Sequence, residues 1–371
     1  MENQNLPDNL LPQILYRLPV KSLVRFKSVC KYWFTLIQSR SFVSLHLRCG
    51  VAQNTDYILG KRSLNCGVNG AMVLSLIHFE TPTQDLDISF IGINIRALQL
   101  LGHCNGVVCL TRKDLNSTIV ICNPSIKEFR VLPRPSYKKG HFSTLGFGFD
   151  PHTDSYKVVK FGFRTPFSVT TEVDDTVEIY DSGTDSWRRV EAESSFGLGL
   201  NFKYSCCTSW NGDFYWYARN QGGNVAIVVF RMADEVFNVI PLPEEVCLLD
   251  NSSERRLSVL NDSLAVVIYP SGWVYPSRFG LLEKSFVVWV MEEHGVEVSW
   301  VKKFTIGPLY GLDFALGFRL NGEFLLKNGR GQLKSYRIDT QQIKEYQVYG
   351  APQCLQVLLC TESLVSIRRQ N

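Results

Sequence analysis

The sequence lacks the features that mark most membrane proteins and the common classes of enzyme. No apolar run exceeds six residues, as in Val225–Phe230, so none approaches the roughly 20 residues of a membrane-spanning helix. There is no His-Glu-x-x-His pair, no phosphate loop ending in Gly-Lys-Ser/Thr and no Gly-x-Ser-x-Gly elbow. The six histidines are scattered, and we expect a turn or packing role for His103, which precedes Cys104-Asn105-Gly106. We therefore expect no enzyme activity, no cofactor and no metal.

The sequence also has no Cys-x-x-Cys pair, and its cysteines number an odd eleven. Several of them, including Cys109, Cys122 and Cys360, lie inside apolar, strand-like runs. A free buried cysteine behaves as a small hydrophobic residue and fits a reducing compartment. Residues 1–5 have neither the basic nor the apolar segment of a secretory signal. We expect a cytoplasmic protein, with the nucleus as a second possible location.

Charge is unevenly divided along the chain. The net charge of residues 1–50 is +5, and the remaining residues have a net charge of −1. A basic head can bind nucleic acid or an acidic protein. Here the basic residues alternate with leucines of the kind found in cores, whereas nucleic-acid binding favours longer basic runs or exposed aromatic residues. We therefore expect an acidic protein partner, and neither nucleic acid nor a membrane.

Two periodic apolar segments open the chain. We expect Asp8 to cap a helix that ends at Pro19, because apolar residues recur between them at three- and four-residue steps. Pro12 fits only within the first turn of that helix. A second periodic segment follows, with Leu23, Phe26, Val29, Cys30, Trp33, Leu36 and Ile37. Periodicity alone leaves open that these helices simply cap a core.

The joint order of short motifs in this region carries a resemblance to a known module. Leu-Pro at 6–7, Arg-Leu-Pro at 17–19, Arg-Phe-Lys at 25–27 and Val-Cys-Lys at 29–31 occur at fixed offsets. The segment resembles the F-box, which docks on the Skp-type adaptor of cullin-based ubiquitin ligases. The resemblance implies binding to that adaptor, and through it to cullin and RING subunits. The implied adaptor contacts are Leu6, Pro7, Leu10, Ile14, Leu15, Leu18, Pro19, Leu23, Val29, Cys30 and Trp33.

Beyond about residue 55, short runs of β-branched and aromatic residues alternate with turn residues. A loose repeat runs from an Asn-Gly-type turn through two apolar strands to a closing aromatic residue. The closing aromatics are Phe129, Trp187, Phe237, Trp300 and Tyr346. Successive members are separated by 58, 50, 63 and 46 residues. Because a propeller blade takes roughly 40–50 residues, the pattern favours a propeller-like, kelch-like domain. A β-sandwich is the alternative.

The body of the chain carries a second resemblance. Gly102-His103-Cys104-Asn105-Gly106, Cys122-Asn123-Pro124 and Gly146-Phe147-Gly148-Phe149-Asp150 resemble the plant F-box-associated domain. Asp85–Phe90, Met291–Val296 with Ser299–Pro308, and Glu362–Leu364 are most similar to S-locus F-box proteins. The fold class we expect is α+β, with an F-box at 1–50, a connecting segment and the start of the β domain at 51–100, and the F-box-associated β domain at 101–371.

These resemblances imply a substrate receptor of a cullin-based ligase, with no active site of its own. If the S-locus resemblance holds, the target is a non-self stylar S-ribonuclease in pollen; the alternative is a receptor for another plant protein. An acidic cluster, Glu172, Asp174 and Asp175, is the candidate contact for a basic target, and a solvated loop is the simpler interpretation. The rival class is a β-propeller enzyme or carbohydrate-binding module with an unrelated helical cap.

Overall fold

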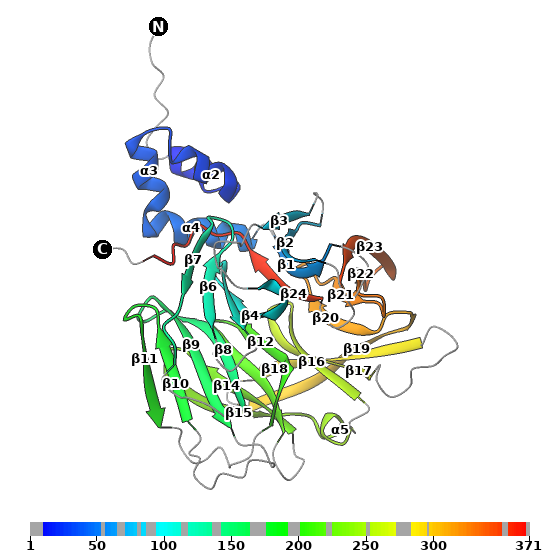
Figure 1. Ribbon diagram of the computed structural model, residues 1–371. Helices are drawn as coiled ribbons and strands as arrows, with labels where there is room; N and C mark the ends of the chain where they lie inside the picture. Colours follow the sequence, from blue (N-terminus) through cyan, green and yellow to red (C-terminus); the bar gives the residue numbers. More distant parts are fainter. Residues whose placement is uncertain are drawn as a thin grey trace.

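The computed structural model describes residues 10–52, 56–64, 71–79, 83–86, 94–112, 118–135, 142–163, 176–191, 201–219, 225–249, 253–271, 283–294, 297–350 and 355–368. A helical module, residues 10–52, stands on one face of a β-propeller (Figure 1). Within these described ranges, no helix is both long and apolar enough to span a membrane.

The helical module has four helices: α1 (Leu10–Leu15), α2 (Val20–Phe26), α3 (Lys31–Gln38) and α4 (Arg40–Ala52). Pro12 lies in the first turn of α1, as predicted, and its carbonyl accepts a hydrogen bond from the Tyr16 amide at 3.0 Å. The second periodic segment is not one helix. It breaks before Cys30, whose sulfur caps α3 by accepting a hydrogen bond from the Trp33 amide at 3.5 Å.

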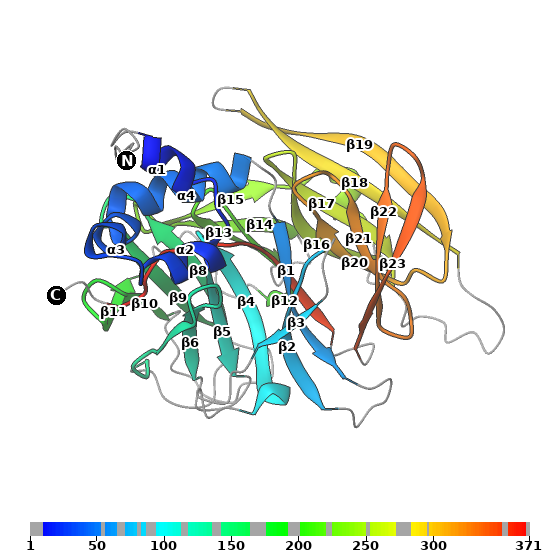
Figure 2. The ribbon, with the colours of Figure 1, turned by 90° about the horizontal axis from the view of Figure 1, so that it is seen from above.

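The strands described here form six four-stranded antiparallel sheets, arranged as the blades of a propeller (Figure 2). Blade 1 holds β1 (Asp56–Ser63), β2 (Met72–Ile77), β3 (Gln84–Leu86) and β24 (Gln356–Thr361); blade 2, after the short helix η2 (Ile95–Ala97), holds β4 (Leu98–Cys104), β5 (Val107–Arg112), β6 (Ile119–Asn123) and β7 (Glu128–Val131). Blade 3 holds β8 (Phe142–Asp150), β9 (Ser155–Phe163), β10 (Thr176–Asp181) and β11 (Ser186–Glu191); blade 4 holds β12 (Asn201–Trp210), β13 (Asp213–Arg219), β14 (Val225–Arg231) and β15 (Val236–Pro241). Helix α5 (Glu244–Cys247) leads to blade 5, with β16 (Ser253–Leu260), β17 (Ser263–Pro270), β18 (Glu283–His294) and β19 (Glu297–Tyr310); blade 6 holds β20 (Phe314–Phe318), β21 (Phe324–Lys327), β22 (Gln332–Arg337) and β23 (Gln342–Tyr349).

Blade 1 closes the ring, because it combines strands from both ends of the β domain. Strand β1 pairs with β2 on one side and with β24 on the other, where Tyr57 lies opposite Cys360. A buried cluster that includes Ile58, Leu325 and Val357 fills the space between blades 6 and 1. Similar clusters lie between the other neighbouring blades. The propeller prediction is therefore confirmed, and the β-sandwich alternative is wrong.

The predicted closing aromatics all lie on the fourth strand of a blade, on β7, β11, β15, β19 and β23. Two of them link one blade to the preceding blade. The Trp187 indole N–H donates a hydrogen bond to the carbonyl of Pro133 at 2.6 Å, and that of Trp300 donates to the carbonyl of Pro241 at 2.8 Å. At these two positions the closing aromatic residue thus contacts a proline carbonyl of the neighbouring blade.

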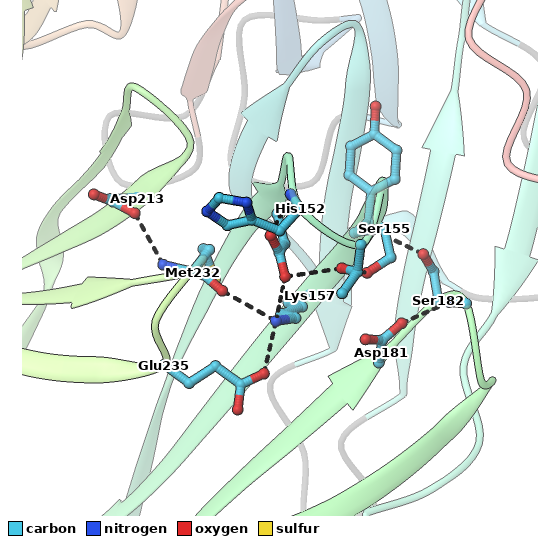
Figure 3. A network of polar contacts seen from close by, with 12 residues as sticks. His152, Ser155, Lys157, Asp181, Ser182, Asp213, Met232 and Glu235 are labelled. Carbon is cyan, nitrogen blue, oxygen red and sulfur yellow. Dashed lines mark hydrogen bonds and ion pairs between the residues drawn. The ribbon is translucent and has the colours of Figure 1, made fainter. Parts of the chain in front are cut away.

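A buried ion network ties blade 3 to blade 4 (Figure 3). The Lys157 ammonium donates to Asp150 at 2.7 Å within blade 3, and to Glu235 at 2.6 Å and the Met232 carbonyl at 3.0 Å in blade 4. The side chains of Lys157 and Asp150 are only 3% and 1% exposed. Such buried charges are tolerated because each is paired and hydrogen-bonded.

Candidate interaction surface

The helical module has its own small core, which is completed by the propeller. Leu15, Leu23 and Ile37 are fully buried and pack together with Phe42 of α4 and with Leu364, which follows β24. Helices of six to thirteen residues are marginal alone, so packing around this cluster holds them in place.

Outside this core, the module exposes apolar side chains. Its large hydrophobic residues with the greatest exposure are Val29 at 59%, Tyr32 at 53%, Ile14 at 49%, Phe34 at 46% and Leu10 at 41%. Val24 and Leu45 are exposed as well. Single exposed apolar residues are common on protein surfaces, but a concentration of them within about 40 residues marks an interaction site.

The charge around these apolar side chains has one sign. Residues 10–52 contain Lys and Arg but neither Asp nor Glu, and Lys21, Arg25 and Lys31 are exposed. This basic and apolar surface, which we call the module surface, fits a partner with an apolar groove and an acidic rim.

The structure divides the adaptor contacts that the resemblance implied. Leu10, Ile14, Pro19, Val29 and Cys30 are exposed. Leu18 and Trp33 are partly buried against the module core, whereas Leu15 and Leu23 are 1% and 0% exposed and belong to it. Because Leu15 and Leu23 are buried, they are not accessible for direct contact with an adaptor. They instead pack beneath the exposed residues of the module surface and hold the helices in place. Leu6 and Pro7 lie outside the described residues.

Sequence reasoning missed Val24, Tyr32 and Phe34 as candidates for the module surface. Each lies on a short helix whose other apolar residues face the core, and the periodic pattern shows only that a stripe exists. The missed signal was the excess of apolar residues over one stripe, because α2 and α3 together carry more of them than a core-facing stripe requires.

The propeller has a second face, away from the helical module. In blade 3, the turn between β8 and β9 contacts the module, because Asp154 pairs with Arg40 of α4. The opposite ends of β9 and β10, at Phe163 and Thr176, therefore lie at the far face (Figure 1). The predicted target contacts Glu172, Asp174 and Asp175 fall between these two strands in the sequence and lie outside the described residues.

The described part of the chain holds no group of three or more His, Cys, Asp or Glu side chains that could bind a metal ion. Desolvation raises the pKa of the Cys104 and Cys122 thiols to about 12, so both are poor nucleophiles. Burial lowers the pKa of His103 to about 4, and its neutral ring accepts a hydrogen bond from the Gly106 amide at 2.9 Å. This confirms the turn role predicted for His103.

Comparison with known proteins assigns both parts of the chain. The family described as "F-box domain" matches residues 4–45, and the family described as "F-box associated beta propeller domain" matches residues 67–365. Among solved structures, TolB from Acinetobacter baumannii has a TM-score of 0.48 at 11% identity, over 87% of this chain and 73% of that chain. That likeness is too remote to bear on function.

Curated relatives are also named as F-box proteins, and one of the three described here is named as a kelch-repeat protein as well. F-box protein At5g49610 of Arabidopsis thaliana is 26% identical, over 81% of this chain and 79% of its own length. F-box/kelch-repeat protein At3g23880 of Arabidopsis thaliana is 28% identical, over 82% and 80%. Putative F-box protein At3g16210 of Arabidopsis thaliana is 30% identical over 64% of this chain, which spans 61% of that relative's length. The chain belongs to the F-box proteins that carry an F-box associated beta propeller domain.

Proposed function

We propose that this protein is the substrate receptor of an SCF-type cullin ubiquitin ligase. The observation that carries the proposal is the module surface, a basic and apolar face without carboxylates on a module that stands apart from the far face of the propeller. The module surface binds the Skp-type adaptor, which brings cullin and RING subunits. The propeller holds the target, in the cytoplasm or the nucleus.

In this function the protein supplies proximity rather than chemistry. Holding the target beside the ubiquitin carried by another subunit converts a bimolecular encounter into an effectively intramolecular one. A rigid receptor serves this purpose, because effective concentration falls when the two bound partners move freely relative to each other.

The proposal is tested by co-expressing the full chain with a plant Skp-type adaptor and separating the products by size-exclusion chromatography. We expect a stoichiometric complex that survives dilution, because apolar side chains leave water when the module surface is covered. If the chain elutes alone, folded and at monomer size, the receptor function is refuted. The rival interpretation, a propeller enzyme or carbohydrate-binding module, predicts that outcome.

A narrower proposal concerns the target, a basic S-ribonuclease recognised in pollen self-incompatibility. It rests on the resemblance of three sequence segments to S-locus F-box proteins, while the relatives reported above are Arabidopsis F-box proteins whose names mention no S-locus role. Its candidate contact is the acidic cluster of Glu172, Asp174 and Asp175.

For the narrower proposal, replacing Glu172, Asp174 and Asp175 with serine should slow capture of an S-ribonuclease by roughly tenfold at low salt and by less as salt rises. Surface plasmon resonance at several salt concentrations measures the association rate. Adaptor binding by the same triple variant is the control and should not change. An association rate equal to that of the wild-type chain at low salt would remove this cluster from the contact.

A further inference from the structure

Residues 362–368, which we call the closing segment, run from the innermost strand of blade 1 to the helical module (Figure 1). Ser363, Leu364 and Ile367 within it are 0%, 4% and 6% exposed. Leu364 packs into the core of the helical module, together with Leu15 and Leu23. Ile367 packs into the cluster between blades 2 and 3. A segment of seven residues is thus shared by two hydrophobic cores.

Blade 2 holds the backbone of the closing segment in place. The Asn123 side-chain amide is fully buried and donates hydrogen bonds to the carbonyls of Ser363 at 3.0 Å and Val365 at 2.9 Å. Its oxygen accepts a hydrogen bond from the Ser125 amide at 3.0 Å, which fixes its orientation. Because both backbone carbonyls have a partner inside the protein, the segment can be buried at little cost.

Two further contacts from blade 2 fix the closing segment. Glu128 accepts hydrogen bonds from the Ser366 hydroxyl at 2.8 Å and the Ile367 amide at 3.0 Å. Gly106, at a φ of 80°, lies so close that an added Cβ would stand 2.0 Å from the Cβ of Ser363. The position of the closing segment is therefore fixed by close packing against Gly106 and by hydrogen bonds to Glu128.

The direct polar contact between the helical module and blade 3 is weaker than the contacts that the closing segment makes. Arg40 and Asp154 form an ion pair, but their side chains are 75% and 51% exposed, and exposed pairs contribute little. Ile126, in the turn between β6 and β7, adds one partly buried apolar contact to the module core. Leu364, which is 4% exposed, joins that core from the propeller side and is more deeply buried than Ile126.

We propose that the closing segment is the coupling element that fixes the helical module rigidly on the propeller. This rests on the proposed function for its purpose, since a fixed module sets where the target lies relative to the adaptor. Leu364 provides the apolar contact, and Asn123 positions the backbone that carries it. Without the segment, the module would stay attached through the chain but would lose its fixed orientation.

The test is hydrogen–deuterium exchange on the free full-length chain, so that it does not depend on the adaptor. In Leu364→Ala, the amides of α1–α3 should exchange at least about tenfold faster, because the module core loses a buried leucine, while the propeller strands keep their protection. The matched control is Leu333→Ala, which removes a fully buried leucine from the cluster between blades 6 and 1. It should leave exchange in α1–α3 unchanged.

A second variant separates coupling from loss of the module core. Asn123→Ala removes both hydrogen bonds to the closing segment and leaves Leu364 in place. We expect the amide exchange rate of α1–α3 to rise by about threefold. Exchange should then be fastest in Leu364→Ala, intermediate in Asn123→Ala and slowest in the wild-type chain. Unchanged exchange in α1–α3 in both variants would overturn the proposal, and so would an equal rise in Leu333→Ala.

A ubiquitination assay with adaptor, cullin and RING subunits connects this coupling to function. With wild-type receptor, modification should concentrate on a few target lysines; with Leu364→Ala, it should spread over more lysines, although the adaptor still binds. If the wild-type chain binds no adaptor, the proposed function fails, while the exchange result still decides whether the segment couples the two parts. An identical lysine pattern for both receptors would reject the functional role of the coupling.

Discussion

Replacing Ile14 and Val29 with aspartate is expected to weaken binding of the Skp-type adaptor by at least about a hundredfold. Both side chains are apolar and exposed, at 49% and 59%, and they belong to the module surface rather than to its core. Covering a carboxylate without a partner costs several kcal/mol, which is comparable to the energy of an interface hot spot, ~2 kcal/mol or more. Isothermal titration calorimetry with the purified adaptor measures the loss.

The chain offers a matched control for this double variant. Val239 on β15 is 54% exposed, and Val239→Asp should leave adaptor affinity unchanged because blade 4 lies outside the module surface. Thermal unfolding should be similar for all three proteins, since exposed positions are substituted. Adaptor affinity equal to wild type in Ile14→Asp/Val29→Asp would contradict the assignment of the module surface.

The choice of exposed positions matters for this experiment. The sequence alone would place such charges at Leu15 and Leu18 as readily as at Ile14 and Val29, because all four are among the adaptor contacts that the F-box resemblance implies. Leu15 is 1% exposed, so aspartate there would disrupt the module core, and lost binding would report unfolding rather than a lost contact. The periodic stripe in the sequence identified the helices, but it could not tell their buried residues from those left exposed for a partner.

Blades 2 to 6 could be predicted because each is a local unit. In these blades the four strands follow one another in the chain, so that each closing aromatic residue marks the end of a blade. Blade 1 has no such closing aromatic residue among those predicted from the sequence. Its strands β1–β3 lie within residues 56–86, while its innermost strand β24 comes from residues 356–361. A pairing between segments this far apart depends on closure of the ring, which no local pattern contains.

The break between α2 and α3 escaped prediction for a local reason. Cysteine is a weak capping residue, and Cys30 caps α3 through a long N–H to sulfur contact of 3.5 Å. The apolar spacing continues across the break, so the pattern of Leu23, Val29 and Trp33 resembles one helix. The closing segment was equally hidden, because Leu364 belongs to a core whose other members lie more than 300 residues earlier, apart from Ile126.

The buried ion network gives the second prediction with a large effect. Lys157→Met is expected to lower the free energy of unfolding by about 3–5 kcal/mol, because it leaves Asp150 charged, unpaired by the ammonium and only 1% exposed. Glu235 keeps its ion pair with Arg188, so the loss of the Lys157 ammonium affects Glu235 less than it affects Asp150. Urea unfolding followed by intrinsic fluorescence measures the change at neutral pH.

The control for this substitution is the same change at a pair whose carboxylate is exposed. Lys334 pairs with Glu345 at 2.7 Å, but the Glu345 side chain is 57% exposed. Lys334→Met should therefore cost less than about 1 kcal/mol. Equal losses of unfolding free energy in Lys157→Met and Lys334→Met would show that burial of the network contributes nothing.

The pH dependence of the same variant separates a lost charge pair from lost packing. Burial opposes ionisation of Asp150, but hydrogen bonds from Lys157, Thr153 and the His152 amide outweigh it and lower the pKa to about 2. Because this folded-state pKa is depressed, the contribution of Asp150 to wild-type stability is present above its ordinary pKa near 4 and is lost as the pH falls toward 2.

In Lys157→Met, Asp150 loses the hydrogen bond and the positive charge of Lys157 but keeps the hydrogen bonds from Thr153 and the His152 amide, so the pKa of Asp150 rises relative to the wild-type protein. The carboxyl then takes up a proton as the pH falls from 7 toward 4, which removes the unpaired charge. We expect the stability gap between variant and wild type to narrow over this range, and Lys157→Met/Asp150→Asn to be more stable than Lys157→Met at pH 7. Two results together would assign the loss to packing of the lysine side chain instead. The stability difference between wild type and Lys157→Met would stay constant from pH 7 to pH 4, and Lys157→Met/Asp150→Asn would be no more stable than Lys157→Met.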